Sequence, residues 1–270
     1  MINLNLMMWN ANSLVRDLAE FYNYLSHKDI HIAFISETCF KPHMNIKHPK
    51  YTIHRNDRLD ASRGGVALFI KKSIKHKQMK TIKCKLIESI GIELLTNNSS
   101  IKLVSIYVPG GVNIAQHKTE FKADINLLTK MNEKFLICGD FNARNQLWNC
   151  STTNTAGKLL MDVATSNGTL IIHPNTPTHF PSDQSRNPST IDLILSNLHN
   201  VSNIVTNSDL YSDHKIVCFQ LGCDEIHDEV PNRIPVYSQT DWVKYTRIIN
   251  ENITLCTCLL YTSPSPRDRG

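Results

Sequence analysis

The chain has 270 residues, of which 41% are hydrophobic and 20% are charged, and its formal net charge is +5. No apolar run is long enough to cross a bilayer, and the first residues alternate apolar and polar side chains without a basic start, which predicts a strand and not a signal peptide. We expect one large soluble domain with a short extension. The positive charge favours a polyanionic partner, although a surplus of this size is also common in proteins that bind none.

In chain order, the spacing of apolar residues alternates between the strand and helix periods. The first half predicts strands at 2–9, 30–35, 66–70, 87–95 and 101–108, a helix at 14–25 behind a Ser13 cap, and a helix at 114–131. The second half predicts strands at 135–138, 169–173, 190–195, 203–206 and 215–221, a helix at 157–166, and a long loop at 174–188. Strands outnumber helices and many are joined by turns, so we expect an α/β fold in which one sheet packs on another with helices outside. Polar residues at strand ends would then gather at one rim.

The eight cysteines show no CxxC pair and no zinc-binding Cys/His spacing, and several lie within apolar runs. A core of this size needs no disulfides. We therefore predict reduced, mostly buried thiols in a reducing compartment.

A carboxylate and a carboxamide follow the apolar run at 135–138. Gly139 lets the backbone turn, and Asp140 and Asn142, two residues apart in an extended chain, would project together. Such a pair suits hydrolysis of a phosphate ester, because the Asp can take a proton from water while the Asn amide donates to a phosphate oxygen. An Asx-rich turn after a core strand is the alternative.

Other strand ends carry polar side chains that suit the same chemistry. Glu37 could bind a hard cation such as Mg²⁺, and Asn10 could brace Glu37 or a phosphate. The Tyr107 hydroxyl could donate to a phosphate oxygen, and Arg63 precedes two glycines where the backbone can approach a ligand. Taken alone, each also has an ordinary explanation as a turn, core or strand-entry residue.

The segment Ser212-Asp213-His214 precedes one predicted strand, and Asp192 opens another. A carboxylate could therefore orient the His214 imidazole from a neighbouring strand. A histidine held in this way can stay charged beside a scissile phosphate and stabilise its developing charge. An Asp-His dipeptide alone is weak evidence.

Together these motifs resemble a known family. Seven of them stand in the order seen in the endonuclease/exonuclease/phosphatase family: Trp9-Asn10, Ser36-Glu37-Thr38, Arg63-Gly64-Gly65, Ile106-Tyr107-Val108-Pro109, Gly139-Asp140-Phe141-Asn142-Ala143, Thr190-Ile191-Asp192 and Ser212-Asp213-His214. Over residues 2–222 the chain more closely resembles the N-terminal endonuclease domain of jockey-like non-LTR retrotransposon polyproteins. Each motif is weak, but seven in order are specific.

The resemblance implies a DNase-like four-layer sandwich, two packed mixed β-sheets flanked by helices, and phosphodiester cleavage that depends on Mg²⁺, with Mn²⁺ as a substitute. Carried over by position, Glu37 would be the main metal carboxylate, with Asn10 and Asp213 close by. Position 12 is Asn where the abasic-site repair endonucleases of the family carry Asp, which points away from a repair enzyme and leaves the number of metal ligands open.

The same resemblance implies roles for the remaining rim residues. Asp140 would activate the attacking water, Asn142 and Tyr107 would hold the phosphate, and His214, oriented by Asp192, would face the scissile phosphate. In retroelement relatives this activity nicks chromosomal DNA, and the freed 3′ hydroxyl primes reverse transcription. Double-stranded DNA, element RNA and a reverse transcriptase domain are therefore the expected partners, with no membrane and no secretion. The protein would be made in the cytoplasm and act in the nucleus.

Two regions bear on DNA binding, besides Arg63. The segment 71–85 carries seven lysines, Lys71 and Lys72 among them, enough for several phosphate contacts; a solvated hairpin is the alternative. The loop 176–189, with His179 and Arg186, could enter a groove and bias the choice of target.

We expect the endonuclease domain at 1–222, a connector toward a missing reverse transcriptase at 223–254, and a disordered tail produced by assembly or cloning at 255–270. Two alternative functions stay open. One is a phosphodiesterase or phosphatase of the same fold that acts on RNA, an inositol phosphate or a sphingolipid. The other is a degenerate fragment that binds nucleic acid without turnover.

Overall fold

The computed structural model describes residues 2–59, 63–97, 99–131, 133–224, 241–244 and 246–247. The elements are, in chain order, β1 (Ile2–Asn10), α1 (Leu18–His27), β2 (Ile32–Ser36), β3 (Tyr51–Asn56), β4 (Val66–Lys71), β5 (His76–Gln78), β6 (Glu88–Leu95), β7 (Ser100–Tyr107), α2 (Lys118–Thr129), β8 (Lys134–Asp140), the 3₁₀ turn η1 (Gln146–Trp148), α3 (Thr155–Ser166), β9 (Leu170–Ile172), β10 (Asp192–Ser196), β11 (Val201–Asn207) and β12 (Ile216–Cys223).

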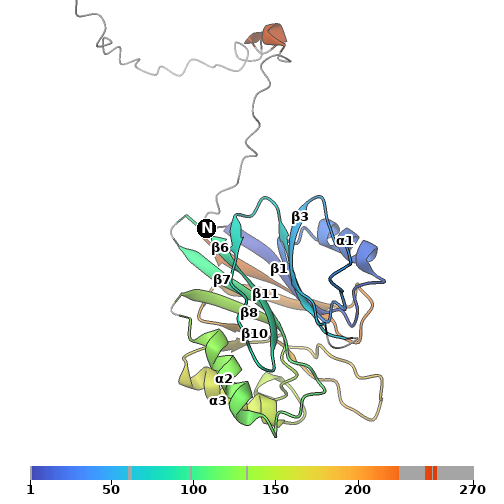
Figure 1. Ribbon diagram of the computed structural model, residues 1–270, viewed down its shortest axis with the longest axis vertical. Helices are drawn as coiled ribbons and strands as arrows, with labels where there is room; N and C mark the ends of the chain where they lie inside the picture. Colours follow the sequence, from blue (N-terminus) through green and yellow to red (C-terminus); the bar gives the residue numbers. More distant parts are fainter. Residues whose placement is uncertain are drawn as a thin grey trace, which may run out of the picture. The chain divides into compact units, whose positions relative to one another are not determined.

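The strands form two six-stranded sheets with the orders β11-β12-β1-β2-β4-β3 and β5-β6-β7-β8-β10-β9. Each sheet has one parallel pair, β1 with β2 and β7 with β8, and antiparallel pairs elsewhere, so both are mixed. Figure 1 shows α1 outside one sheet, with α2 and α3 together outside the other. The predicted four-layer sandwich is therefore confirmed.

Successive side chains of a strand point to opposite faces of the sheet, so each sheet contributes to two apolar layers, one on each face, as the strand period predicts. Leu6 of β1, Leu68 of β4 and Ile92 of β6 share the core between the sheets. On the opposite face of β1, Trp9 stacks on Phe21 of α1 with ring centroids 6.1 Å apart. Full burial of such a side chain stabilises the fold by about 1.5–3 kcal/mol.

The first helix begins later than its sequence pattern predicts. The expected Ser13 cap is wrong: α1 begins at Leu18, and no side chain caps it. The backbone N–H of Ser13 instead donates to the Glu37 carbonyl oxygen (2.9 Å), and Ser13 has a φ of 90°. The segment after β1 is thus tied to the end of β2, which prevents the helix from starting there.

Edge strands β3 and β5 were not predicted. Both contain mostly polar residues, and β5 has only three residues, so neither shows the apolar alternation of a half-buried strand. The six cysteines that the structure describes are free. Cys138, Cys150 and Cys223 are buried, as predicted for most of the thiols, whereas Cys39, Cys84 and Cys218 are half-buried.

The described helices include none long and apolar enough to span a membrane. The last strand ends at Cys223, and the chain divides by internal contacts into Met1–Glu229 and Val230–Gly270. In the second unit, the Thr246 hydroxyl donates to the Trp242 carbonyl oxygen (2.8 Å) within a short helical segment. Most of the predicted connector and the whole of the predicted tail lie outside the described residues, so both stay predictions.

Gly139, near the end of β8, is expected not to tolerate a side chain without a loss of stability. Its φ is 150°, and a Cβ placed on it would lie 2.0 Å from the Ile106 carbonyl oxygen. Gly139→Ala should lower the free energy of unfolding by about 2 kcal/mol or more, which corresponds to about 4–8 °C in melting temperature. Gly111→Ala is the matched control, because nothing lies within 4 Å of its added Cβ. Equal thermal denaturation curves for the two variants would contradict this expectation.

Candidate active site

Five polar side chains meet where strands of the two sheets end. Asn10 closes β1 and is paired with Ser36, the residue before Glu37. In the other sheet Asp140 is paired with both Tyr107 and Asp192, so these three also share one rim. The strand register thus explains why residues far apart in sequence face one another.

The Asn10 side chain joins the two sheets. Its Nδ2 donates to Glu37 Oε1 and to Asp140 Oδ2, each at 3.0 Å, and its Oδ1 accepts from the Asn12 backbone N–H (3.0 Å). Its amide nitrogen therefore faces the two carboxylates and braces them, while its oxygen is committed to the backbone. This geometry favours the bracing role weighed for Asn10; metal ligation by Asn10 stays a prediction.

Asp140 is almost fully buried, at 1% exposure. Burial raises its pKa to about 7, against the lowering effects of the His214 charge and of hydrogen bonds from Asn142 and Asn10. The Asn142 backbone N–H donates to Asp140 Oδ1 (2.8 Å), and the Asn142 amide donates to the Val108 carbonyl oxygen (2.8 Å) and to Asp140 Oδ2 (3.3 Å). Asp140 is therefore held in place and can exchange a proton near neutral pH.

Tyr107 lies buried at the same rim. Burial, followed by the nearby charges of Glu37 and Asp140, raises the pKa of its hydroxyl well above the usual range. The hydroxyl therefore stays protonated and can serve as a hydrogen-bond donor, as the phosphate-holding role requires.

His214 completes the cluster from the start of the last strand. Its Nδ1 lies 2.8 Å from Asp192 Oδ2, and its Nε2 lies 3.8 Å from Asp140 Oδ2. Burial alone would lower the His214 pKa, but the carboxylates of Asp192, Asp140 and Asp213 outweigh it and raise the pKa to about 9. The imidazole is thus charged at neutral pH and held by a carboxylate from a neighbouring strand, as the sequence suggested.

Three neighbours that the sequence did not assign to the site position His214 and Asp192. The Trp9 indole donates to the His214 carbonyl oxygen (3.1 Å), and the Ser212 hydroxyl donates to the Asn10 carbonyl oxygen (2.8 Å). Thr178 Oγ1 accepts from the Asp192 backbone N–H (3.3 Å). Trp9 and Ser212 stand inside recognised motifs, whereas Thr178 lies in the predicted loop and carries no sequence signal.

His179 belongs to the same cluster, although the sequence suggested only a DNA-binding role for it. Its ring centroid lies 4.6 Å from that of His214, and its Nε2 lies 3.8 Å from Asp213 Oδ2. Burial and the His214 charge lower its pKa to about 4, so it is neutral at pH 7. The Asn12 side chain holds the Asp213 carboxylate of this cluster, because Asn12 Nδ2 donates to Asp213 Oδ1 (3.2 Å).

Two groups at this rim could hold a metal ion. His179, Asp213 and His214 offer ligand atoms that lie within 4.8 Å of one another. Glu37 is half-buried, and its backbone φ of 49° directs it from the end of β2 toward Asn10. A hard cation such as Mg²⁺ prefers carboxylate and water oxygens to imidazole, and the Glu37 carboxylate therefore fits it better.

The residues predicted to bind DNA lie in different places. Arg63 precedes the glycine turn, and that turn borders the site because the Gly65 carbonyl oxygen accepts from the Thr38 N–H (3.1 Å). Arg186 is exposed in the 176–189 loop. Lys71 is the last residue of β4, and Lys72 follows it. Lys71 lies about 16 Å along the strand from Val66, which is paired with Ser36 beside the site.

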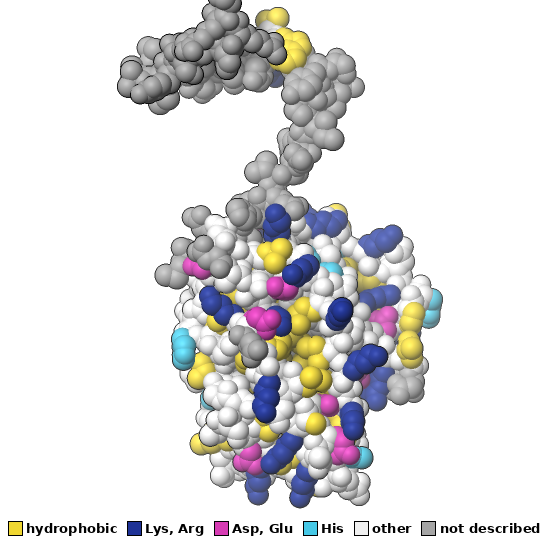
Figure 2. Space-filling view, turned by 60° about the vertical axis from the view of Figure 1, so that its left-hand side comes forward, with side chains coloured by type: hydrophobic (Ala, Val, Ile, Leu, Met, Phe, Trp, Pro, Cys, Tyr) yellow, Lys and Arg dark blue, Asp and Glu magenta, His cyan; other side chains and the backbone are white. Residues whose placement is uncertain are grey.

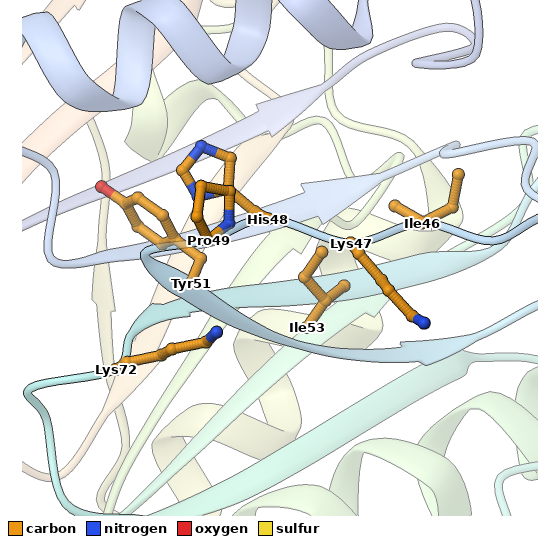
Figure 3. A pocket seen from close by; sticks show the side chains of 7 residues that line it. All are labelled: Ile46, Lys47, His48, Pro49, Tyr51, Ile53 and Lys72. Carbon is orange, nitrogen blue, oxygen red and sulfur yellow. The ribbon is translucent and has the colours of Figure 1, made fainter.

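The structure therefore does not bring these two lysines to the candidate site. Lys71 pairs with Asp29, and Lys72 lines a hollow of about 450 Å³ with Lys47 and His48, shown in Figure 3. Figure 2 shows Lys and Arg side chains spread over the face it displays, mixed with acidic ones. Contacts of Lys71 and Lys72 with DNA stay predictions, at a distance from the reacting groups.

The two-sheet fold is that of the endonuclease/exonuclease/phosphatase proteins. Residues 101–218 match the family described as Endonuclease-reverse transcriptase. Over these residues the chain is similar to the endonuclease domains associated with non-LTR retrotransposon reverse transcriptases.

Similar proteins agree with this assignment. The chain is 25% identical over 262 residues to the probable RNA-directed DNA polymerase from transposon BS of Drosophila melanogaster, covering 95% of this chain and 28% of that protein. It is 25% identical over 216 residues to the polymerase from mobile element jockey of the same species, covering 78% of this chain and 23% of that one. The endonuclease domain of TRAS1, a telomere-specific non-LTR retrotransposon, has the same fold, with a TM-score of 0.67, 16% identity, and coverage of 82% of this chain and 100% of that one. The chain spans about a quarter of the length of the curated polymerases.

Proposed function

We propose that this chain is a Mg²⁺-dependent endonuclease that nicks double-stranded DNA, so that the new 3′ hydroxyl primes reverse transcription of a non-LTR retrotransposon. It would act in the nucleus, beside the element RNA and a reverse transcriptase domain of the same polyprotein. The observation that carries the proposal is the Asn10 amide, which donates at 3.0 Å to Glu37 and to Asp140 and so holds a metal-binding carboxylate beside a buried base.

The side chains divide the chemistry among them. Asp140, with a pKa raised to about 7, accepts a proton from the attacking water. The charged His214, held by Asp192 at 2.8 Å, faces the scissile phosphate and stabilises its developing negative charge. The Tyr107 hydroxyl donates a hydrogen bond at the phosphate, and the Asn142 amide would do the same in place of its hydrogen bond to Asp140 Oδ2 (3.3 Å). Glu37 would hold the Mg²⁺, which supplies charge neutralisation at the phosphate when bound.

Incubation of the purified full chain with supercoiled plasmid and Mg²⁺ tests the proposal. We expect open circles whose nicks a DNA polymerase extends without prior treatment of the ends, and no product in the presence of EDTA. RNA and an inositol polyphosphate serve as competing substrates. Faster hydrolysis of either one than of plasmid DNA would favour the alternative enzyme, and binding without cleavage of any of them would favour the degenerate fragment.

Replacement of the metal-binding carboxylate is expected to change the metal requirement. Glu37→Gln keeps the shape of the side chain but removes its charge, so the Mg²⁺ concentration for half-maximal nicking should rise about tenfold or more. Glu20→Gln, at an exposed position on α1, is the matched control. An unchanged Mg²⁺ titration for Glu37→Gln would remove Glu37 from the metal site.

The nicking rate is expected to have a bell-shaped pH dependence. Asp140 must lose its proton to act as a base, so the rate rises with pH through its pKa near 7. His214 must keep its proton, so the rate falls as pH passes its pKa near 9. Initial rates from acid to alkaline pH should therefore peak between these values, and His214→Gln should lose the alkaline fall. A wild-type rate that keeps rising beyond pH 9 would contradict these roles.

A further inference from the structure

Two histidines meet at the lateral edge of the sandwich, outside the candidate active site. His54 lies on β3, the edge strand of one sheet, and His76 lies on β5, the edge strand of the other. His54 is paired with Leu68 and His76 with Leu94, and both leucines belong to the core between the sheets. Paired residues point to the same face, so both imidazoles turn inward.

The hydrogen bonds of the two rings fix where their protons lie. His76 Nδ1 lies 2.7 Å from the Ile74 carbonyl oxygen, and His54 Nδ1 lies 3.2 Å from Gln78 Oε1. Both oxygens can only accept, so each Nδ1 carries a hydrogen and each neutral ring keeps its lone pair on Nε2. The two Nε2 atoms lie 3.0 Å apart, so these lone pairs face each other. Two facing lone pairs repel, so the contact is favourable when a proton or a metal ion lies between the two nitrogens.

We propose that His54 and His76 bind a divalent transition-metal ion of the Zn²⁺ type through their Nε2 atoms. Imidazole suits Zn²⁺, Ni²⁺ and Cu²⁺, whereas Mg²⁺ requires oxygen ligands. Two nitrogens about 2.0–2.1 Å from Zn²⁺ at a tetrahedral angle lie about 3.3 Å apart. The rings therefore need to separate by only a few tenths of an ångström to bind the ion.

The surroundings of the pair are those of metal-binding histidines. Such histidines donate their other ring N–H to a carbonyl or carboxylate, which orients the ring, and here Ile74 and Gln78 provide the acceptors. Burial and the neighbouring His76 lower the His54 pKa, against the hydrogen bond to Gln78, so its ring is neutral at pH 7. Both rings are half-buried, which leaves the remaining positions of the ion to water.

The proposed ion would join two elements that belong to different sheets. No ladder hydrogen bonds link β3 with β5, since each pairs only with a neighbour in its own sheet. An ion that binds both edges in the folded state, and not in the unfolded chain, stabilises the fold. This role is independent of nuclease activity and does not rest on the proposed function.

Calorimetric titration of the full chain with Zn²⁺ at neutral pH tests the site. All proteins are prepared in a His179→Gln background, so that the cluster of His179, Asp213 and His214 does not contribute. His54→Gln and His76→Gln are each expected to lower the Zn²⁺ affinity about tenfold or more, while His48→Gln, outside both clusters, leaves it unchanged. Zn²⁺ should raise the melting temperature of the His179→Gln protein but not of the two variants, whereas any effect of Mg²⁺ bound at Glu37 should be the same in all three proteins.

A second measurement needs no further substitution. In NMR spectra of the His179→Gln protein, the ring proton signals of His54 and His76 should shift together on addition of one equivalent of Zn²⁺. Unshifted signals, or equal Zn²⁺ affinity with and without the two imidazoles, would overturn the proposal.

Discussion

Asp140→Asn is expected to lower the Mg²⁺-dependent nicking rate by about 10²- to 10⁴-fold, the contribution of a positioned general base. The substitution keeps the size of the side chain, and its oxygen can still accept from the Asn142 backbone N–H, which lies 2.8 Å from Asp140 Oδ1. It removes the group that takes a proton from water. The initial rate of open-circle formation from supercoiled plasmid is the measurement.

Asp162→Asn is the matched control for this substitution, because Asp162 is an exposed carboxylate on α3. It should nick at the wild-type rate. Melting temperatures of both variants show whether the fold is intact. A folded Asp140→Asn protein that nicks at the wild-type rate would mean that another group activates the water.

The second large effect is expected for the pair of His214 and Asp192. His214→Gln should lower the nicking rate by about 10²- to 10³-fold, because it removes the charge that stabilises the transition state. Asp192→Asn removes the charge that contributes most to the raised His214 pKa, and it replaces the charge-assisted hydrogen bond that holds Nδ1 at 2.8 Å by a weaker neutral one. Its rate should therefore fall, and its alkaline limb should move to lower pH.

The Asp192→Asn/His214→Gln double variant shows whether Asp192 acts only by positioning His214 or also contributes on its own. If Asp192 acts only through His214, the combined substitution should cost about as much as His214→Gln alone. Losses that multiply would assign Asp192 a role of its own. Thr178→Val, which removes the hydroxyl that accepts from the Asp192 N–H, tests the next support of the same carboxylate.

The sequence predicted the sandwich and the rim residues for the same physical reason. A buried strand has an apolar pattern, and a polar residue at its end or directly after it must lie at the rim of the sheet, as Asp140 and Glu37 do. The strand period also predicts which side chains face the core. The convergence of the two sheets on Asn10 was not predictable from spacing, because it depends on how the sheets pack.

The local sequence pattern did not predict the positions of residues that are determined by contacts between distant segments. Lys71 and Lys72 belong to a basic run, but only the strand register shows that they lie at the end of β4 that is away from the site. His179 lies in a loop without periodicity, and its isolated bridges to Ser189 and His214 bring it into the cluster. Ser13 has a capping side chain, yet its backbone is bound to Glu37.

The central claim is that Asp140 and His214 work in one centre, and the nicking rate of the Asp140→Asn/His214→Gln double variant tests it most directly. Groups that act on one phosphate lose their effect together, so we expect the double variant to be no slower than the slower single variant. A rate reduced by the product of the two single effects, in a protein with the wild-type melting temperature, would show that the two residues contribute independently and would contradict a shared centre.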